Sequence, residues 1–350
     1  MEENITNKIN DMEKVRIGIV GMGRMGITHF SIINSHPRVQ VVSVSDTSKM
    51  ILGYLEKYVD GIKVYDDFEK QLEAGDLDGI IVSTPSSLHY RICKKALEKN
   101  ISVFCEKPFT TNPEQAKELA VDFAKAGLVN QVGYVTRCWD SFTKMKELLD
   151  SGLLGKVIHF KAEMFSSTIT KPQTESSWRS KRENGGGATY EMGSHVIDLI
   201  NYILGVPDKI EGSSLAQIFS TTVEDIVDTT MIYNDGKVGQ FHVNWSDSSY
   251  RKSMMKLDFF CEKGKIIADH YAIKFYLFND QEGYAKGWHM LNYTDTYRPV
   301  PFYVRGGAFT TQLYMFADKI LDNKVTCPCT FEDGAKAQDV IHRIFNDAQK

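Results

Sequence analysis

The sequence predicts an α/β protein in which a doubly wound parallel sheet is followed by an α+β domain with a large, open, mixed or antiparallel sheet. Through the first 135 residues, short apolar segments alternate with helical ones, which is typical of a parallel sheet covered on both faces. After about residue 156, longer segments with two-residue alternation and tight turns take over, which indicates antiparallel pairing with one open face. A chain of 350 residues is long enough for two cores.

The first half of the chain contains ten predicted elements. The expected strands are short and rich in β-branched residues, and they span residues 15–20, 39–44, 63–65, 79–83, 101–105 and 129–135. The expected helices span residues 24–35, 49–58, 88–99 and 113–126. Pro113 suits the first position of its helix, and Asn112 suits the N-cap.

The second half changes in character after a helix at 141–151. Strands are expected at 157–165, 209–219, 225–233, 238–245, 256–261 and 265–278, with hairpin turns at 234–236 and 262–264 and closing helices at 307–321 and 331–348. The polar segment 171–184 predicts either an ordered loop over a cleft or a mobile lid. These boundaries divide the chain into a loose tail (1–14), a dinucleotide-binding domain (15–135) and a substrate and oligomerisation domain (136–350).

Composition excludes several classes of protein. The net charge of −4 and the pI of about 6.2 argue against nucleic-acid binding. No apolar run approaches the length of a membrane span, and residues 1–14 lack the apolar core of a secretory signal. The six cysteines contain no Cys-x-x-Cys pair. We therefore expect reduced thiols, no metal site and a cytoplasmic location.

A glycine motif follows the first strand and opens a helix. Gly21 permits a tight turn, Gly23 lets a pyrophosphate approach the backbone, and Gly26 lets helix and strand pack closely. Asp46 ends the second strand 20 residues later, where a carboxylate binds ribose hydroxyls and repels a 2′-phosphate. The motif predicts NAD as cofactor. Lys49 leaves NADP open, and a purely structural glycine turn is the alternative.

Two further segments end strands at the edge where ligands bind in such sheets. Thr84-Pro85, with His89, is interpreted either as a turn with a helix cap or as a cofactor-facing loop. In Glu106-Lys107-Pro108, the lysine either hydrogen-bonds a substrate oxygen or forms a salt bridge at the end of the strand.

The segment 186–201 carries Glu191, His195 and Asp198 at spacings of four and three. On a helix these three side chains share one face, so that carboxylates accompany a histidine that could transfer protons. The alternative is an ordinary half-buried histidine on an amphipathic helix.

Taken together, these motifs resemble those of the Gfo/Idh/MocA oxidoreductases over about residues 14–350. The matching segments, in chain order, are Gly21-x-Gly23-x-x-Gly26, Thr84-Pro85 with His89, Glu106-Lys107-Pro108, Gly133-Tyr134 with Arg137, Gly152-x-x-Gly155-Lys156-Val157, and Gly185-Gly186-Gly187 with His195-x-x-Asp198.

The resemblance implies a Rossmann domain, an open sheet that forms a homodimer or homotetramer, and a cis peptide bond before Pro108. Lys107 and His195 match the catalytic lysine and histidine of the family, and Glu191 lies where many members carry Asp. The residues expected at the cofactor are Gly21, Gly23, Arg24, Met25, Gly26, Asp46, Thr84, Pro85, His89, Glu106, Trp178 and Arg179.

The predicted function is hydride transfer between NAD(H) and a secondary alcohol or ketone of a sugar, sugar derivative or cyclitol. His195 serves as acid and base, Lys107 holds the reacting oxygen, and Glu191 orients His195 or a substrate hydroxyl. Tyr134, Arg137 and Asp198 are expected to contact the substrate. Because an arginine can pair with a phosphate or carboxylate, a nucleotide-linked sugar is one alternative. A non-catalytic NAD(P)-binding regulator is another.

Overall fold

The computed structural model describes residues 14–172, 177–281 and 283–350, and these residues form two compact units. Within the described residues, the first unit contains 14–110, 114–133 and 300–332, and the second contains 111–113, 134–299 and 333–350. The predicted tail lies outside the described residues except for Lys14, and the predicted domain boundaries stay predictions.

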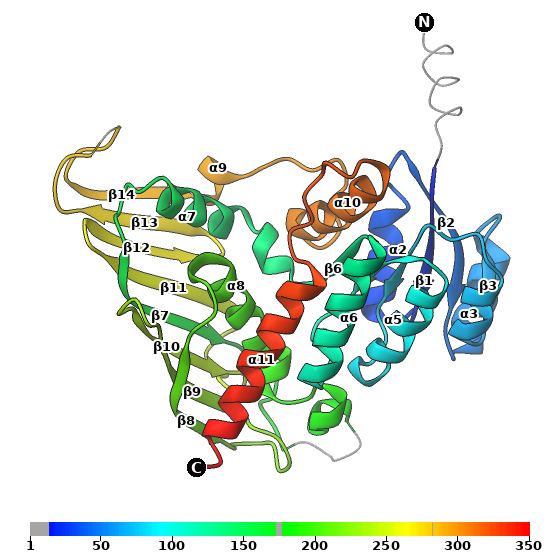
Figure 1. Ribbon diagram of the computed structural model, residues 1–350, viewed down its shortest axis with the longest axis horizontal. Coiled ribbons are helices and arrows are strands. Elements are labelled where there is room, and N and C mark those ends of the chain that lie inside the picture. Colours follow the sequence, from blue (N-terminus) through cyan, green and yellow to red (C-terminus); the bar gives the residue numbers. More distant parts are fainter. Residues whose placement is uncertain (1–13, 173–176, 282) are drawn as a thin grey trace, which may run out of the picture. The chain divides into compact units, whose positions relative to one another are not determined.

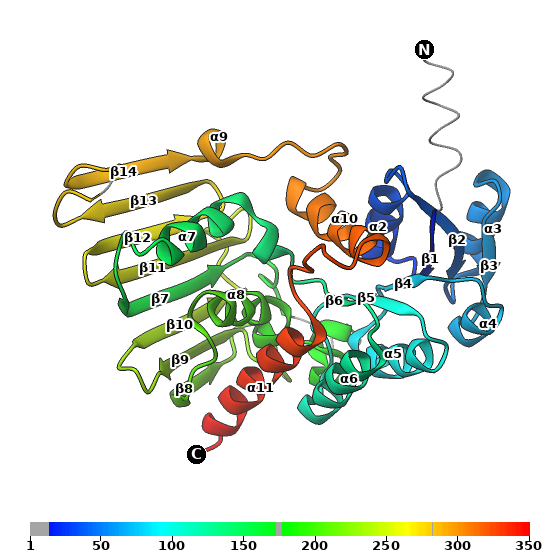
Figure 2. The same ribbon diagram turned by 45° about the horizontal axis from the view of Figure 1, so that its top comes forward.

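The first unit is built on a six-stranded parallel sheet in the order β3-β2-β1-β4-β5-β6 (Figures 1 and 2). Its strands are β1 (Val15–Val20), β2 (Val39–Ser45), β3 (Lys63–Tyr65), β4 (Gly79–Val82), β5 (Ser102–Cys105) and β6 (Asn130–Val132). The direction of strand addition reverses between β1 and β4. In doubly wound sheets, ligands bind outside the carboxyl ends of the strands at this switch point.

Helices fill the crossovers of this sheet, as the alternation predicted. They are α2 (Arg24–Ile33), α3 (Lys49–Tyr58), α4 (Phe68–Glu73), α5 (His89–Glu98) and α6 (Pro113–Ala126). A sixth helix, α10 (Gly307–Leu321), comes from far along the chain and packs beside α2 and β1 (Figures 1 and 2). The short helix α4 was not predicted, although Asp67 caps it by accepting hydrogen bonds from the backbone amides of Glu69 and Lys70.

The second unit contains an eight-stranded mixed sheet in the order β14-β13-β12-β11-β7-β10-β9-β8 (Figure 2). Its strands are β7 (Val157–Phe165), β8 (Lys209–Ala216), β9 (Ile226–Ile232), β10 (Val238–Asn244), β11 (Met254–Cys261), β12 (Gly264–Asp269), β13 (Ala272–Leu277) and β14 (Gly287–Asn292). Only β7 and β10 pair in parallel. The predicted fold class is therefore confirmed in both parts.

One predicted strand of the second sheet is in fact two. The segment 265–278 divides into β12 and β13 because Asp269 accepts hydrogen bonds from the amides of Tyr271 and Ala272, which turns the chain back on itself. The edge strand β14 was not predicted.

Helices cover one face of this sheet. They include α7 (Asp140–Asp150) and α8 (Ser194–Leu204), which contact β12 and β7 respectively. The short helix α9 (Tyr293–Thr296) follows β14, and α11 (Phe331–Asp347) ends the chain. Along β10, Phe241 and Val243 are buried beneath the helices while Gln240 and His242 alternate onto the open face. This pattern is the predicted alternation of a sheet with one open side.

Asp225 organises the beginning of β9. Its buried carboxylate accepts hydrogen bonds from the amides of Ile218, Phe219 and Ser220, from the Ser220 hydroxyl at 2.6 Å and from the Trp245 indole at 2.5 Å. Burial alone would raise the pKa of Asp225, but these hydrogen bonds from Ser220, Trp245 and Ile218 lower it below its ordinary value.

We predict that Asp225→Ala lowers the free energy of unfolding by about 3 kcal/mol at neutral pH, since several buried donors lose their acceptor. Because the folded pKa is lowered, the contribution of Asp225 is complete above the unfolded pKa of about 4 and is lost as the pH falls through the folded value. Urea unfolding between pH 7 and pH 3 measures both effects. Asp235→Ala, at an exposed ion pair, is the control and should lower the free energy of unfolding much less than Asp225→Ala. An equal loss in the two variants would contradict the role of Asp225.

Candidate functional site

The turn between β1 and α2 has the geometry of a dinucleotide cradle. Gly21 has φ +90°, and a Cβ on Gly26 would lie 1.9 Å from the carbonyl oxygen of Gly21. The first turn of α2 therefore approaches the end of the strand too closely for a side chain at position 26. A Cβ on Gly23 would meet no atom within 4 Å, so space is open at the N-terminus of α2 where Arg24 and Met25 begin the helix. Oriented amides at such a helix end bind phosphate.

Asp46 lies at the other side of this cradle. Its carboxylate accepts hydrogen bonds from the Met22 amide at 2.6 Å and from the Ser48 amide at 2.7 Å. These bonds hold the acid against the glycine loop, at the end of β2 where a ribose is bound in this fold. A carboxylate has capacity for further hydrogen bonds, including those from two ribose hydroxyls. The residues present therefore fit NAD.

Lys107 lies just past β5, and the peptide bond between Lys107 and Pro108 is cis, as the resemblance implied. The preceding Glu106 is buried and accepts a hydrogen bond from His29 Nε2 at 2.7 Å. Burial alone would raise the pKa of Glu106, but His29 and the neighbouring Lys107 outweigh burial and lower it. Glu106 is therefore a buried carboxylate anion directly before Lys107 in the chain.

His89 braces the same segment. Its side chain is fully buried, with Nε2 3.0 Å from the carbonyl oxygen of Thr84 and Nδ1 within 3.2 Å of the carbonyl oxygens of Pro108 and Phe109. Burial lowers the pKa of His89 below its ordinary value. The imidazole therefore ties the loop of Thr84 and Pro85 to the chain after Lys107. This differs from the direct cofactor contact that we expected, since no part of the ring is exposed.

His195 lies in the first turn of helix α8 in the second unit, and the helical conformation changes just before it. Residues Thr189–Gly193 form a π-helical turn, and α8 continues from Ser194. The His195 ring is partly exposed and meets the buried Tyr134 ring edge-on, with 5.8 Å between centroids. Single π-helical turns occur frequently at functional sites. The sequence predicted a helix here without this irregularity.

Asp198 and Arg137 form a buried ion pair. Arg137 Nε donates to Oδ2 at 2.8 Å and Nη2 donates to Oδ1 at 2.7 Å, while Nη1 lies 3.4 Å from Asp333. The guanidinium also lies over the Tyr202 ring. Both side chains are at most 3% exposed. These contacts fix α8 to the segment that carries Tyr134. The expected contacts of Arg137 and Asp198 with a substrate stay predictions.

Glu191 is paired in the same bidentate manner with Arg179. Nε donates to Oε2 at 2.8 Å and Nη2 donates to Oε1 at 2.9 Å. The Arg179 guanidinium lies 4.7 Å from the ring centre of Trp178, whose side chain is 44% exposed. The structure therefore joins the Trp178-Arg179 pair to the π-helical turn. The part of the predicted loop that is described, from Ser177 onward, forms two short 3₁₀ turns.

Glu224 was missed by sequence reasoning. It is 2% exposed, accepts from the Thr189 amide at 3.0 Å and pairs with Arg182 at 2.9 Å. A Cβ on Gly187 would lie 2.5 Å from this carboxylate. The run of glycines at 185–187 was the available signal, because it indicated a close approach. The approaching group is distant in sequence and was not visible.

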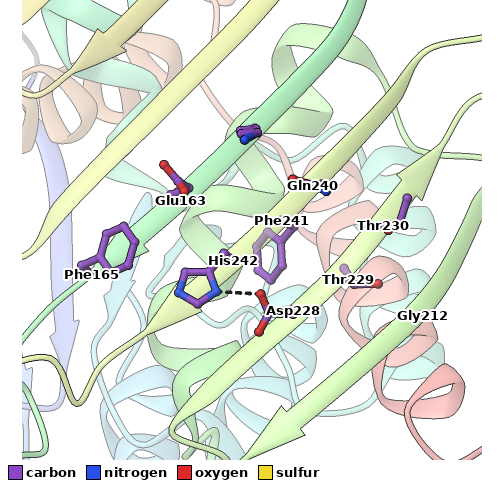
Figure 3. Close-up of a pocket in the computed structure, with 10 residues that line it drawn as sticks. Glu163, Phe165, Gly212, Asp228, Thr229, Thr230, Gln240, Phe241 and His242 are labelled. Atoms are coloured by element: carbon purple, nitrogen blue, oxygen red, sulfur yellow. Dashed lines mark hydrogen bonds and ion pairs between the residues drawn. The ribbon is translucent and has the colours of Figure 1, made fainter.

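A pocket with a volume of about 410 Å³ lies on the open face of the second sheet (Figure 3). Glu163, His242 and Asp228 stand side by side there on β7, β10 and β9, and His242 Nδ1 lies 2.7 Å from Asp228. This pocket contains none of the predicted site residues. Across the described ranges, no cluster of three metal-binding side chains occurs and no helix is long and apolar enough to cross a membrane.

Comparisons with known proteins agree with this architecture. Residues 15–134 match the oxidoreductase family with an NAD-binding Rossmann fold, and residues 142–267 match the GFO/IDH/MocA C-terminal domain. The chain therefore belongs to the GFO/IDH/MocA family of oxidoreductases and has an NAD-binding domain. The family that the motifs resembled is confirmed.

Several relatives are similar to the chain. The rhizopine catabolism protein MocA of Rhizobium meliloti is 28% identical over 65% of this chain and 70% of its own length. The NAD⁺-dependent scyllo-inositol 2-dehydrogenase of Bacillus subtilis is 28% identical over 55% of this chain, and the match spans 54% of that enzyme. A structure of levoglucosan dehydrogenase with NADH and levoglucosan superimposes with a TM-score of 0.85 at 18% identity, covering 96% of this chain and 98% of the other.

We predict that Gly23→Ala weakens NADH binding, whereas Gly26→Ala lowers the stability of the fold. Gly23→Ala leaves the melting temperature unchanged, because its Cβ meets no protein atom, but weakens NADH at least tenfold by occupying the phosphate space. Gly26→Ala destabilises the protein by about 3 kcal/mol or more. Thermal unfolding and NADH fluorescence titration measure the two quantities, and Gly53→Ala on α3 should leave both unchanged or slightly improve stability. Full NADH affinity in Gly23→Ala would contradict phosphate binding in the space at Gly23.

We predict that Asp46→Asn changes cofactor preference. The amide keeps an acceptor for the loop but removes the charge that repels a 2′-phosphate, so the ratio of NAD to NADP affinity should fall at least tenfold. Calorimetric titration with both dinucleotides measures this ratio. If Asp46→Asn lowered the affinities for NAD and NADP equally, the ribose would not be bound at Asp46.

Proposed function

We propose that the protein is an NAD(H)-dependent oxidoreductase acting on a secondary alcohol or ketone of a sugar, a sugar derivative or a cyclitol. The observation that supports this most is the presence in one chain of three features: a dinucleotide cradle at Gly23 and Asp46, a lysine just past a strand end and before a cis proline, and His195 on a braced helix. The similarity to a scyllo-inositol 2-dehydrogenase and to a levoglucosan dehydrogenase supports the substrate class.

The residues have distinct chemical roles in this proposal. NAD, when bound, supplies the nicotinamide carbon that exchanges hydride with the carbinol carbon. Lys107 donates a hydrogen bond to the reacting oxygen and stabilises its negative charge. His195 takes the hydroxyl proton during oxidation and returns it during reduction. Glu191 acts as a positioning residue, since its carboxylate is bonded to Arg179.

An uncharged polyol is the substrate that the charges of the second unit favour. A nucleotide-linked sugar needs a cation for its phosphates, and Arg137 was the candidate. Its guanidinium instead pairs with Asp198 and Asp333. Arg179 and Arg182 are likewise paired, with Glu191 and Glu224. This pairing weakens the case for an acidic or phosphorylated substrate.

We also propose a cytoplasmic homodimer or homotetramer. All six cysteines are free thiols, which suits a reducing compartment. The open sheet face exposes large side chains at its edge, including Trp288 and Met290, which are 60% and 51% exposed. Light scattering behind size exclusion measures the oligomeric state.

The proposal is tested by an NADH-absorbance screen over inositols, polyols, aldoses, levoglucosan, sugar acids and nucleotide sugars. Turnover of an uncharged member is the expected outcome. Turnover restricted to nucleotide sugars would favour the alternative substrate class. NADH binding without turnover of any member would favour the regulator.

With a substrate in hand, we predict that Lys107→Ala and His195→Ala each lower kcat by about 10²–10⁴-fold while NADH still binds. The reason is that each variant loses one group that stabilises charge or moves the proton. Stopped-flow and steady-state kinetics measure the loss. Lys125→Ala and His342→Ala, at exposed helix positions, are matched controls and should retain activity. Normal turnover in either test variant would remove that residue from the mechanism.

A further inference from the structure

We propose that the Arg179–Glu191 ion pair is a latch that positions His195 for proton transfer, which makes Arg179 a positioning residue. This inference rests on the proposed function. The latch is defined as these two side chains, which join the 3₁₀ turn at Trp178–Ser180 to the π-helical turn at Thr189–Gly193.

The geometry of the pair restrains orientation as well as distance. Two parallel hydrogen bonds of 2.8 and 2.9 Å align the guanidinium plane with the carboxylate. The Glu191 side chain is 15% exposed, so water competes weakly for it. The Arg179 guanidinium carbon also lies over the Trp178 ring, 4.7 Å from its centre. Arg179 is therefore held by an indole and a carboxylate together.

The latch acts at the turn that leads directly into His195. The beginning of this turn is fixed by Glu224, which accepts from the Thr189 amide, while its backbone carbonyl accepts from the Ala188 amide. Glu191 lies in the middle of the turn, four residues before His195. Holding the turn at two points sets the direction in which α8 starts, and hence the placement of the imidazole.

The partner segment is also rigidly anchored, so it can serve as a fixed support. A Cβ on Gly186 would lie 2.3 Å from the Arg179 carbonyl oxygen, which shows how closely the chain folds back. The Gly186 amide donates to the Lys181 carbonyl at 3.0 Å, and the Thr222 hydroxyl donates to the Ser180 carbonyl. Arg182 adds a second ion pair, to Glu224.

The latch depends on the length of the side chain at position 191. Glu191→Asp retracts the carboxylate by about 1.5 Å, one C–C bond, and neither neighbouring backbone segment is free to follow. The latch therefore requires glutamate at 191 and a forked guanidinium at 179, and Arg179→Lys supplies the charge without the fork.

The experiment measures chemical rescue of kcat at saturating NADH and substrate. Arg179→Ala should lower kcat about 10²-fold, since a misplaced catalytic group costs on this order. Methylguanidinium should restore at least a tenth of the lost activity to Arg179→Ala by binding Glu191, and should restore none to the double variant Arg179→Ala/Glu191→Gln. Because the pair acts as one unit, the double variant should be no slower than the slower single variant.

Three outcomes would overturn the latch: equal rescue in the single and double variants, losses that multiply in the double variant, or a loss confined to NADH affinity with kcat unchanged. Arg91→Ala, which breaks the exposed Arg91–Glu69 pair, is the matched control and should change kcat less than twofold.

A second readout does not depend on finding a substrate. Hydrogen exchange of the amides at 189–195 should be at least tenfold faster in Arg179→Ala than in the wild type, and methylguanidinium should reverse the increase. Unchanged exchange would overturn the latch even if turnover were found. Faster exchange without turnover of any carbohydrate would support the latch and contradict the proposed function.

Discussion

The contact between Gly26 and the carbonyl oxygen of Gly21 is the constraint on which the first unit depends. Because any side chain at 26 would overlap that oxygen, α2 can lie directly against the end of β1. This closeness turns the first amides of α2 toward open space at Gly23 and brings the Met22 amide to the Asp46 carboxylate. Phosphate and ribose recognition therefore follow from one steric condition and one hydrogen bond, with His89 and Glu106 fixing the neighbouring strand ends.

In the second unit, several acidic side chains mainly hold neighbouring segments of the chain together. Glu191, Asp198 and Glu224 each pair with an arginine, and Asp225 is bonded to amides, a hydroxyl and an indole. A buried ion pair is a weak source of net stability, because desolvation offsets much of the attraction, but breaking one partner is costly. Such pairs therefore specify geometry. In this unit they specify the start and direction of the helix that carries His195.

The sequence was sufficient to predict elements whose signal is local. The apolar runs of β1, β4 and β5 and the glycine loop before α2 are set by periodicity and turn chemistry, and the structure has them where they were expected. The π-helical turn, the split of 265–278 and the edge strand β14 depend on individual turns or weak alternation. The pairings of the site residues depend on groups far apart in the chain. Arg137 and Asp198 are 61 positions apart, and Glu224 is 35 positions from the amide it binds. The spacings of four and three predicted that Glu191 and Asp198 accompany His195, but they gave no sign that each acid also pairs with an arginine.

This redistribution of partners changes what the site can recognise. If the arginines near His195 were unpaired, the site would attract anions, and a phosphate or carboxylate on the substrate would be the natural ligand. Arg137, Arg179 and Arg182 each pair with a protein acid, which supports the proposal that the substrate is recognised by hydrogen bonds and by shape. Hydroxyl-rich, uncharged rings suit such a surface, because each hydroxyl both donates and accepts. In the proposed function, Lys107 supplies the cation at the reacting oxygen, where charge would develop during hydride transfer.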